Sequence, residues 1–262
     1  MELDNIYNMD CLEGMRQMES ESVDLTVTSP PYDNLRTYNG YCFDFENIAR
    51  ELYRVTKQGG VVVWVVGDAT IDGSETGTSF RQALFFMECG FRLHDTMIYA
   101  SDKPPLTHNR YEQQFEYMFV LSKGKPTTFN PIKVPTIFAG IDKGARTFRE
   151  SDNRLRSGHK NEVVSDTKIK GNIWKYETGN MCSTKDAVAF NHPAIFPEKL
   201  ARDHITSWSN EGDIVLDPFM GSGTTAKVAR ALGRHYIGFE ISAEYCDIIR
   251  QRLEQTKTLF DL

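Results

Sequence analysis

The chain has 262 residues, a length that is enough to build one large α/β domain. Its apolar content of 40% excludes an intrinsically disordered protein. The net charge of −6 does not by itself indicate a nucleic-acid-binding protein. No apolar run approaches the roughly 18–20 residues that span a bilayer, and the polar N-terminus does not resemble a signal peptide. The five scattered cysteines argue against a disulfide framework and against a metal site, and they predict a cytoplasmic protein.

The first third of the chain alternates strand and helix patterns. Residues 3–7 and 23–28 are short apolar segments that predict strands. Asp44 can cap a helix with apolar side chains at helical spacing, and this helix is expected to end at the glycine pair 59–60. Residues 61–66 are an unbroken apolar run rich in β-branched side chains, as expected for a central parallel strand that is covered on both faces.

The same alternation continues to the C-terminal end. A stripe of Phe80, Ala83, Leu84 and Met87 predicts a second helix, and strands are expected at residues 91–99 and 115–121. Later strands at residues 213–217 and 236–239 flank a helix, and a last helix follows them. Seven expected strands alternating with helices predict an α/β fold with a doubly wound, mostly parallel, seven-stranded Rossmann-like sheet.

Residues 123–191 interrupt this pattern. Regular periodicity fades there, and a structureless loop of such length is unusual in a compact domain, so we interpret the segment as a small irregular insertion. Between Lys123 and Lys175 there are 12 Lys and Arg against 5 Asp and Glu, whereas the rest of the chain is acidic. A basic segment in an acidic chain indicates a surface that faces a polyanion.

A glycine-rich turn follows the strand expected at residues 213–217. Gly221 and Gly223 would let a ligand approach the backbone, and the next helix would present free N–H groups to it. The pattern Gly-x-Gly-x-x-Ala fits a dinucleotide fold, but it lacks the lysine of a mononucleotide P-loop. Asp217 favours instead a ligand with a cationic amino group, and Glu240 ends the next strand, where it can accept from a ribose. The turn alone leaves the ligand open, and a turn without any ligand is the structural alternative.

Ser29-Pro30-Pro31-Tyr32 follows the strand expected at residues 23–28, at the end where open α/β sheets bind ligands. The prolines remove backbone donors and leave carbonyl acceptors, which suits a flat base that carries an amino group. Ser29 Oγ and the Pro30 carbonyl could accept both amine protons and so localise the nitrogen lone pair, while Tyr32 stacks on the base. A base in a duplex must be flipped out to reach such a site. A plain Pro-Pro turn is the structural alternative.

Together the two motifs resemble those of the β class of amino DNA methyltransferases. Here Thr-Ser-Pro-Pro-Tyr precedes Asp-Pro-Phe-Met-Gly-Ser-Gly-Thr-Thr. In that class the catalytic half likewise precedes the cofactor half, with a target-recognition region between them. The resemblance implies a Rossmann-like methyltransferase sheet with a catalytic half at residues 1–122, target recognition at 123–191 and a cofactor-binding half at 192–262. Segment Asn8–Leu12 resembles the family's Gly-Asp-Cys-Leu, which implies that Asp10 and the Cys11 amide contact the adenine of the cofactor.

The resemblance also implies the ligands. S-adenosyl-L-methionine is expected at Asp10, Cys11, Asp217, Pro218, Phe219, Gly221, Ser222, Gly223, Thr224 and Glu240. The catalytic residues are expected to be Ser29, Pro30, Pro31 and Tyr32, and the DNA contacts Arg146, Arg149, Arg154 and Arg156. Double-stranded DNA is the expected partner, with a cognate restriction endonuclease and a homodimer as further expectations and no membrane association.

The serine of the Ser-Pro-Pro-Tyr motif favours N4 of cytosine as the target in this family, with N6 of adenine as the alternative. Methylation at carbon 5 of cytosine is disfavoured because it needs a cysteine nucleophile, typically after proline, and no Pro-Cys pair occurs. A NAD-dependent oxidoreductase would explain the glycine turn but neither Ser-Pro-Pro-Tyr nor the basic segment. A methyltransferase acting on RNA or on protein amides, and a non-catalytic DNA-binding regulator, are the remaining alternatives.

Overall fold

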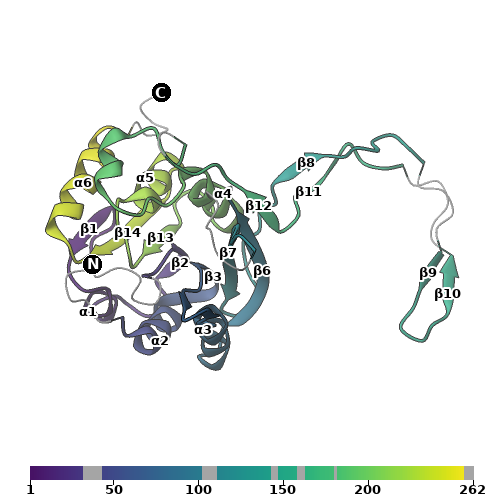
Figure 1. The fold of residues 1–262 in the computed structure, drawn as a ribbon, viewed down its shortest axis with the longest axis horizontal. Helices are drawn as coiled ribbons and strands as arrows, with labels where there is room; N and C mark the ends of the chain where they lie inside the picture. Colours follow the sequence, from purple (N-terminus) through teal and green to yellow (C-terminus); the bar gives the residue numbers. More distant parts are fainter. Residues whose placement is uncertain (32–42, 102–110, 143–146, 158–162, 180–181, 257–262) are drawn as a thin grey trace. The chain divides into compact units, whose positions relative to one another are not determined.

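The computed structural model describes residues 1–31, 43–101, 111–142, 147–157, 163–179 and 182–256. Eight strands of this described part form one sheet in the order β1-β14-β13-β2-β3-β7-β6-β12 (Figure 1). Their bounds, in that order, are Asn5–Asn8, His235–Glu240, Ile214–Asp217, Val23–Thr28, Thr56–Val66, Phe115–Ser122, Arg92–Ala100 and Ile173–Lys175.

The sheet is mostly parallel, as predicted. Neighbouring strands from β1 to β3 run parallel, whereas β7 is antiparallel to both β3 and β6. Strand β12 adds an eighth strand, parallel to β6, that comes from the segment expected to be irregular. The Rossmann-like architecture is therefore confirmed, with one strand more than the pattern of apolar residues predicts.

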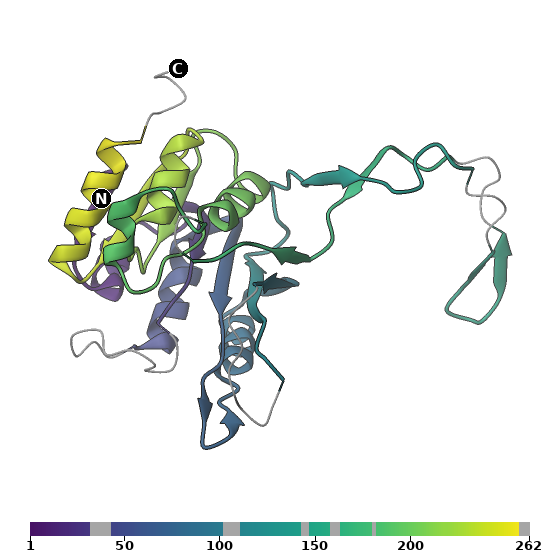
Figure 2. The same ribbon diagram turned by 45° about the horizontal axis from the view of Figure 1, so that its top comes forward.

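Six α-helices of the described part cover the two faces of this sheet. Helices α1 (Cys11–Arg16), α2 (Phe45–Val55) and α3 (Thr78–Glu88) pack side by side on one face. Helices α4 (Glu198–Trp208), α5 (Thr224–Ala231) and α6 (Ala243–Glu254) cover the other face, where Figure 2 shows them in green and yellow. A short 3-10 helix spans Ala187–Asn191. None of the helices in the described ranges is long and apolar enough to cross a membrane.

Strand β3 lies at the centre of the core under α1 to α3. Residues 61–66 are all buried, as their unbroken apolar run predicts. The Trp64 ring packs against Phe86 and Phe219 at centroid distances of 5.1 and 6.2 Å, and its indole N–H donates to Gln82 Oε1 at 2.9 Å. A buried indole needs such a partner, so a polar glutamine is retained inside the core.

Helix α3 occupies the predicted position but buries a different face. Phe80, Leu84 and Met87, whose spacing predicts the helix, are 50%, 60% and 46% exposed. The buried side is Ser79, Gln82, Ala83 and Phe86. Ser79 donates to Asp68 and Gln82 accepts from the indole of β3, so polar partners in the core decide the orientation of this helix.

Gly14 of α1 provides the first testable prediction. A Cβ atom at this position would lie 2.2 Å from Cε1 of Phe239, a fully buried ring that cannot move away freely. We expect Gly14→Ala to lower the free energy of unfolding by about 1–2 kcal/mol, because overpacking costs more than the gain in helix propensity. Urea denaturation measures this, with Glu13→Ala on the exposed side of the same helix as the control; a more stable Gly14→Ala protein would contradict the packing argument.

The described chain divides into two compact units. Unit 1 comprises residues 1–130 and 172–262, and unit 2 comprises residues 131–171. Unit 2 contains two antiparallel strand pairs, β8 (Lys133–Pro135) with β11 (Thr167–Ile169) and β9 (Thr147–Arg149) with β10 (Leu155–Ser157). A further pair in unit 1 joins β4 (Thr70–Ile71) to β5 (Ser74–Glu75).

Unit 2 is shorter than the insertion that the sequence indicates. Residues on both sides of it belong to unit 1: Asn130 donates to the carbonyl groups of Thr206 and Ser209, and β12 pairs with β6. The extent of the target-recognition region, and the role of residues 123–191 in it, stay predictions.

Candidate active site

A cavity of about 390 Å³ opens at the carboxyl ends of β1, β2, β13 and β14. Strand β2 continues through α2 to β3 on one side, whereas β13 continues through α5 to β14 on the other, so the strand order reverses between β2 and β13. Open α/β sheets bind ligands at such a switch point. The cavity therefore lies where the fold class places a site.

Most of the predicted site residues lie together around this cavity. Those that line it are Asp10, Cys11, Ser29, Pro30, Pro31, Asp217, Pro218, Phe219, Gly221, Ser222, Thr224 and Glu240. Gly223 is adjacent in sequence but is not part of the lining. Tyr32 and Arg146 lie outside the described residues.

A direct hydrogen bond joins the two predicted motifs. Thr28, the last residue of β2, donates from its hydroxyl to Oδ1 of Asp217, the last residue of β13, at 2.6 Å. Leu25 and Thr26 of β2 pair with Val215 and Leu216 of β13, so the ends of the two strands lie within one residue of each other. Ser29 follows directly after Thr28, whose hydroxyl binds the Asp217 carboxylate, so the Ser29-Pro30-Pro31 segment begins next to this carboxylate.

Asp217 is held in the cavity wall with little contact with water. Its side chain accepts from the Thr28 hydroxyl and from the Phe219 N–H, the latter at 3.0 Å. Burial raises the pKa of Asp217, although hydrogen bonds from Thr28, Thr225 and the Phe219 amide act in the opposite direction. Ionisation of this carboxyl group is costly, and a cationic group placed in the cavity would stabilise its carboxylate form.

Glu240, at the end of β14, contributes a second acidic group. Its Oε2 accepts from the Gly221 N–H and its Oε1 from the Ser242 N–H, both at 2.9 Å. Burial raises the pKa of Glu240, and the charge of Asp217 contributes in the same direction. Each carboxylate oxygen has a second lone pair and can accept from a ligand hydroxyl. Two carboxylates suit a ligand with an ammonium group and a diol, and they would repel a pyrophosphate.

The glycine turn is shaped by its packing as well as by the cavity. Gly221 and Gly223 have φ angles of 53° and 80°, a region that other residues adopt at a cost. A Cβ atom on Gly223 would lie 2.5 Å from Cγ2 of Ile249 on α6. Gly223 therefore allows α5 and α6 to pack closely, and Gly221, which lines the cavity, is the glycine that a ligand could approach.

Asp10 also has a structural role. It is the N-cap of α1, and its Oδ1 accepts from the backbone N–H groups of Leu12 and Glu13 at 2.8 and 3.2 Å. The cap places Asp10 and Cys11 at the rim of the cavity, beside the end of β1. Their contact with a cofactor adenine stays a prediction.

Several lining residues were not predicted as site residues. Among them are Tyr99, Glu116, Thr178, His192, Phe196 and Tyr245. The ring of His192 packs edge-on against Tyr245 at a centroid distance of 4.4 Å, and its Nδ1 lies 2.7 Å from the Ala194 carbonyl oxygen. No spacing within the segments around Glu116, His192 and Phe196 reveals that they share one cavity.

The predicted DNA-contacting arginines that can be described all lie in unit 2. Arg149 is in β9, and Arg154 and Arg156 are in or next to β10. Arg154 pairs with Asp152 and Arg156 with Glu150, each at 3.4 Å, and both guanidinium groups are largely exposed. Exposed pairs of this kind are weak and can exchange their carboxylate for a phosphate.

Comparison with known proteins identifies the class. A family model for N6/N4 methyltransferases, described as DNA methylase, matches residues 23–251. The orphan methyltransferase M.BamHII of Bacillus amyloliquefaciens is 59% identical over 236 residues, which cover 89% of each chain.

Solved structures share the fold. A putative DNA modification methylase of Thermus thermophilus, in complex with S-adenosyl-L-methionine, has a TM-score of 0.66 at 24% identity, covering 96% of this chain and 93% of that one. The cytosine-N4-specific PvuII DNA methyltransferase also has a TM-score of 0.66, at 19% identity, covering 98% and 95%. The family model and the 59% identical relative exclude a NAD-dependent oxidoreductase. The chain belongs to the N4/N6 family of amino DNA methyltransferases, which act on DNA with S-adenosyl-L-methionine as the methyl donor.

Proposed function

We propose that the protein methylates N4 of cytosine in double-stranded DNA at the cavity between β2 and β13. The observation that carries this proposal is the hydrogen bond between Thr28 and Asp217. It holds the Ser29-Pro30-Pro31 segment next to the Asp217 carboxylate of the cavity, as a transfer between a bound donor and a bound base requires.

The cofactor is assigned to the acidic half of the cavity. Asp217 would accept from the ammonium group of its methionine part and Glu240 from its ribose hydroxyls, because the buried Asp217 and the half-buried Glu240 both line the cavity with acceptor capacity. Asp10 and Cys11 would contact its adenine, and Phe219 supplies an apolar surface. When bound, S-adenosyl-L-methionine supplies an electrophilic methyl group on a sulfonium sulfur.

The target amine is assigned to the residues that follow β2. Ser29 Oγ and the Pro30 carbonyl would accept its two N–H groups, which localises the nitrogen lone pair and raises its nucleophilicity. Ser29 is half-buried and Pro30 is buried, so these acceptors are partly shielded from water. Tyr32 would stack on the flipped base and keep the amine in line for transfer.

Cytosine is favoured over adenine by the sequence of the motif, which carries serine at position 29, the form that this family associates with N4-cytosine targets. Methylation of adenine N6 is the alternative, because both bases present an amine beside a ring nitrogen.

Four arginines are proposed to contact the DNA backbone or guanine edges. They are Arg146 and the exposed arginines of unit 2, Arg149, Arg154 and Arg156. A cognate restriction endonuclease, a homodimer and a cytoplasmic location stay predictions.

The test is transfer of a labelled methyl group from S-adenosyl-L-methionine to genomic DNA that lacks both modifications. We expect labelled N4-methylcytosine after digestion to nucleosides. Labelled N6-methyladenine would assign the alternative target instead. Label in RNA or protein but not in DNA would overturn the assignment of the substrate.

A further inference from the structure

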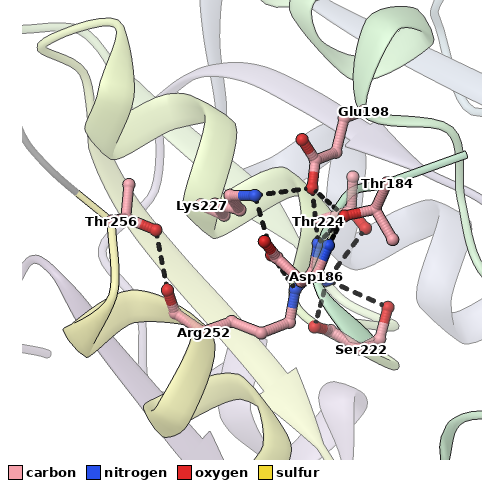
Figure 3. A network of polar contacts seen from close by, with 8 residues as sticks. All are labelled: Thr184, Asp186, Glu198, Ser222, Thr224, Lys227, Arg252 and Thr256. Carbon is pink, nitrogen blue, oxygen red and sulfur yellow. Dashed lines mark hydrogen bonds and ion pairs between the residues drawn. The ribbon is translucent and has the colours of Figure 1, made fainter. Parts of the chain in front are cut away.

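A fully buried arginine lies directly behind the glycine turn. Arg252 of α6 is 0% exposed, and its Nη1 donates to the Ser222 carbonyl at 2.6 Å (Figure 3). The same nitrogen lies 3.2 Å from the hydroxyl oxygens of Ser222 and Thr224. Both of these residues line the cavity, so the guanidinium group holds the cavity wall from its inner side.

Two carboxylates and a second cation complete this cluster, which we call the Arg252 network. Arg252 Nε pairs with Asp186 Oδ2 at 2.9 Å and its Nη2 with Glu198 Oε1 at 2.8 Å. Lys227 Nζ lies 2.7 Å from each of the same two oxygens. Burial acts to raise the pKa of Asp186, but hydrogen bonds from Lys227 and Arg252 outweigh it and hold this pKa below its ordinary value. The network therefore contains two cations and two anions.

The position of Arg252 is not explained by the stability of α5. A cation at the N-terminus of a helix opposes the helix dipole, and a guanidinium group without water is costly unless all its donors are paired. Asp186 and Glu198 offset both costs. An apolar side chain would fill the same space without these costs but would leave the Ser222 carbonyl without its donor, so the charge of Arg252 acts through the carbonyl that it holds.

The turn is held on two sides. Arg252 binds the Ser222 carbonyl, and Glu240 accepts from the N–H of the preceding residue, Gly221, at 2.9 Å. Asp186 and Glu198 also flank the segment that contributes His192 to the cavity lining, and a Cβ atom on Gly221 would lie 3.2 Å from Cε1 of this ring. Loss of the guanidinium group would release the turn, and with it the position of the Glu240 carboxylate.

We propose that Arg252 is a positioning residue for the methyl donor: it fixes the turn at residues 221–224 so that Glu240 and the turn backbone keep the geometry that binds the cofactor. The proposal rests on the placement of S-adenosyl-L-methionine in this cavity. Arg252 touches neither the base nor the reacting atoms, so its effect should fall on cofactor affinity and not on the chemical step.

The experiment compares Arg252→Met with Arg250→Met, which removes an exposed arginine from the same helix that is paired with Asp247. Calorimetric titration with S-adenosyl-L-methionine should show a Kd raised by about 10- to 100-fold for Arg252→Met, as expected for lost hydrogen bonds to a charged group. KM for the cofactor should rise in parallel, while kcat at saturating cofactor stays within about threefold. Arg252→Lys should recover part of the affinity, and Arg250→Met should bind as the unchanged protein does.

A purely structural role would lower the melting temperature of Arg252→Met without changing the Kd measured well below that temperature, and this result would overturn the proposal. If Arg252→Met does not fold, Arg252→Lys carries the test, and an unchanged Kd in that variant overturns it equally. Failure of the unchanged protein to bind the cofactor in the same titration would count against the proposed site instead.

Discussion

An Asp217→Asn protein should lose cofactor binding while folding at least as stably as the unchanged protein. The carboxylate would pair with the ammonium group of S-adenosyl-L-methionine in a site with little water, and removal of one partner of a buried pair costs about 3 kcal/mol, roughly a hundredfold in Kd. Asparagine retains an Oδ1 acceptor for Thr28 and for the Phe219 amide. Its Nδ2 can donate to the hydroxyl oxygen of Thr225, whose hydrogen would then be donated to the Val27 carbonyl, 3.2 Å away, and no longer to residue 217.

The expected stability follows from the sign of the pKa shift. Burial raises the pKa of Asp217 in the folded state, so the folded protein binds this proton more tightly than the unfolded chain does. The contribution of Asp217 to stability is therefore most favourable at low pH and decreases as the pH rises from the ordinary pKa of aspartate through the raised one. The Asn variant lacks this dependence, and its advantage without cofactor should be larger at pH 8 than at pH 5.

Urea denaturation at the two pH values and titration with S-adenosyl-L-methionine measure both effects. Asp213→Asn is the matched control, because Asp213 immediately precedes β13 at the end of the strand away from the cavity and accepts from the Asn210 N–H. Unchanged cofactor affinity in Asp217→Asn would remove Asp217 from the proposed site. A large loss of stability would show that its hydrogen bonds outweigh the cost of its burial.

Tyr32→Ala should abolish most of the methyl transfer and leave cofactor binding unchanged. Stacking of a base on an aromatic ring contributes about 1–3 kcal/mol, and misplacement of the amine adds a further loss, so a decrease in kcat of about a hundredfold or more is expected. Tyr32→Phe retains the ring and is the matched control.

Ser29→Ala, which removes one acceptor of the amine, should lower kcat by about tenfold or more.

Single-turnover transfer to duplex DNA with saturating cofactor separates these effects from binding. Fluorescence of 2-aminopurine at the target position reports whether the base still leaves the duplex. Full activity of Tyr32→Ala would exclude the stacking role. A parallel loss of cofactor affinity in Ser29→Ala would place Ser29 in the cofactor site instead.

Local signals in the sequence determined the elements and the motifs. The apolar run at residues 61–66 predicted the central strand, because a strand that is covered on both faces needs no polar side chain. The pattern of Asp217, Gly221 and Gly223 predicted a strand, a turn and a helix, and β13 and α5 occupy those positions. These features depend on neighbouring residues only, so they can be recognised without knowledge of the fold.

Tertiary structure decided which of these features meet. The bond between Thr28 and Asp217 joins residues 189 positions apart, and it exists because β2 and β13 are adjacent in the sheet. The exposed face of α3 depends on the partners of Gln82 and Ser79 in the core, which helical spacing does not contain. In the sequence, nothing distinguishes Arg252 from other basic residues of amphipathic helices. Only the packing of α6 against the glycine turn buries its charge and pairs it with Asp186 and Glu198, because long-range contacts and not local periodicity determine where a side chain loses water.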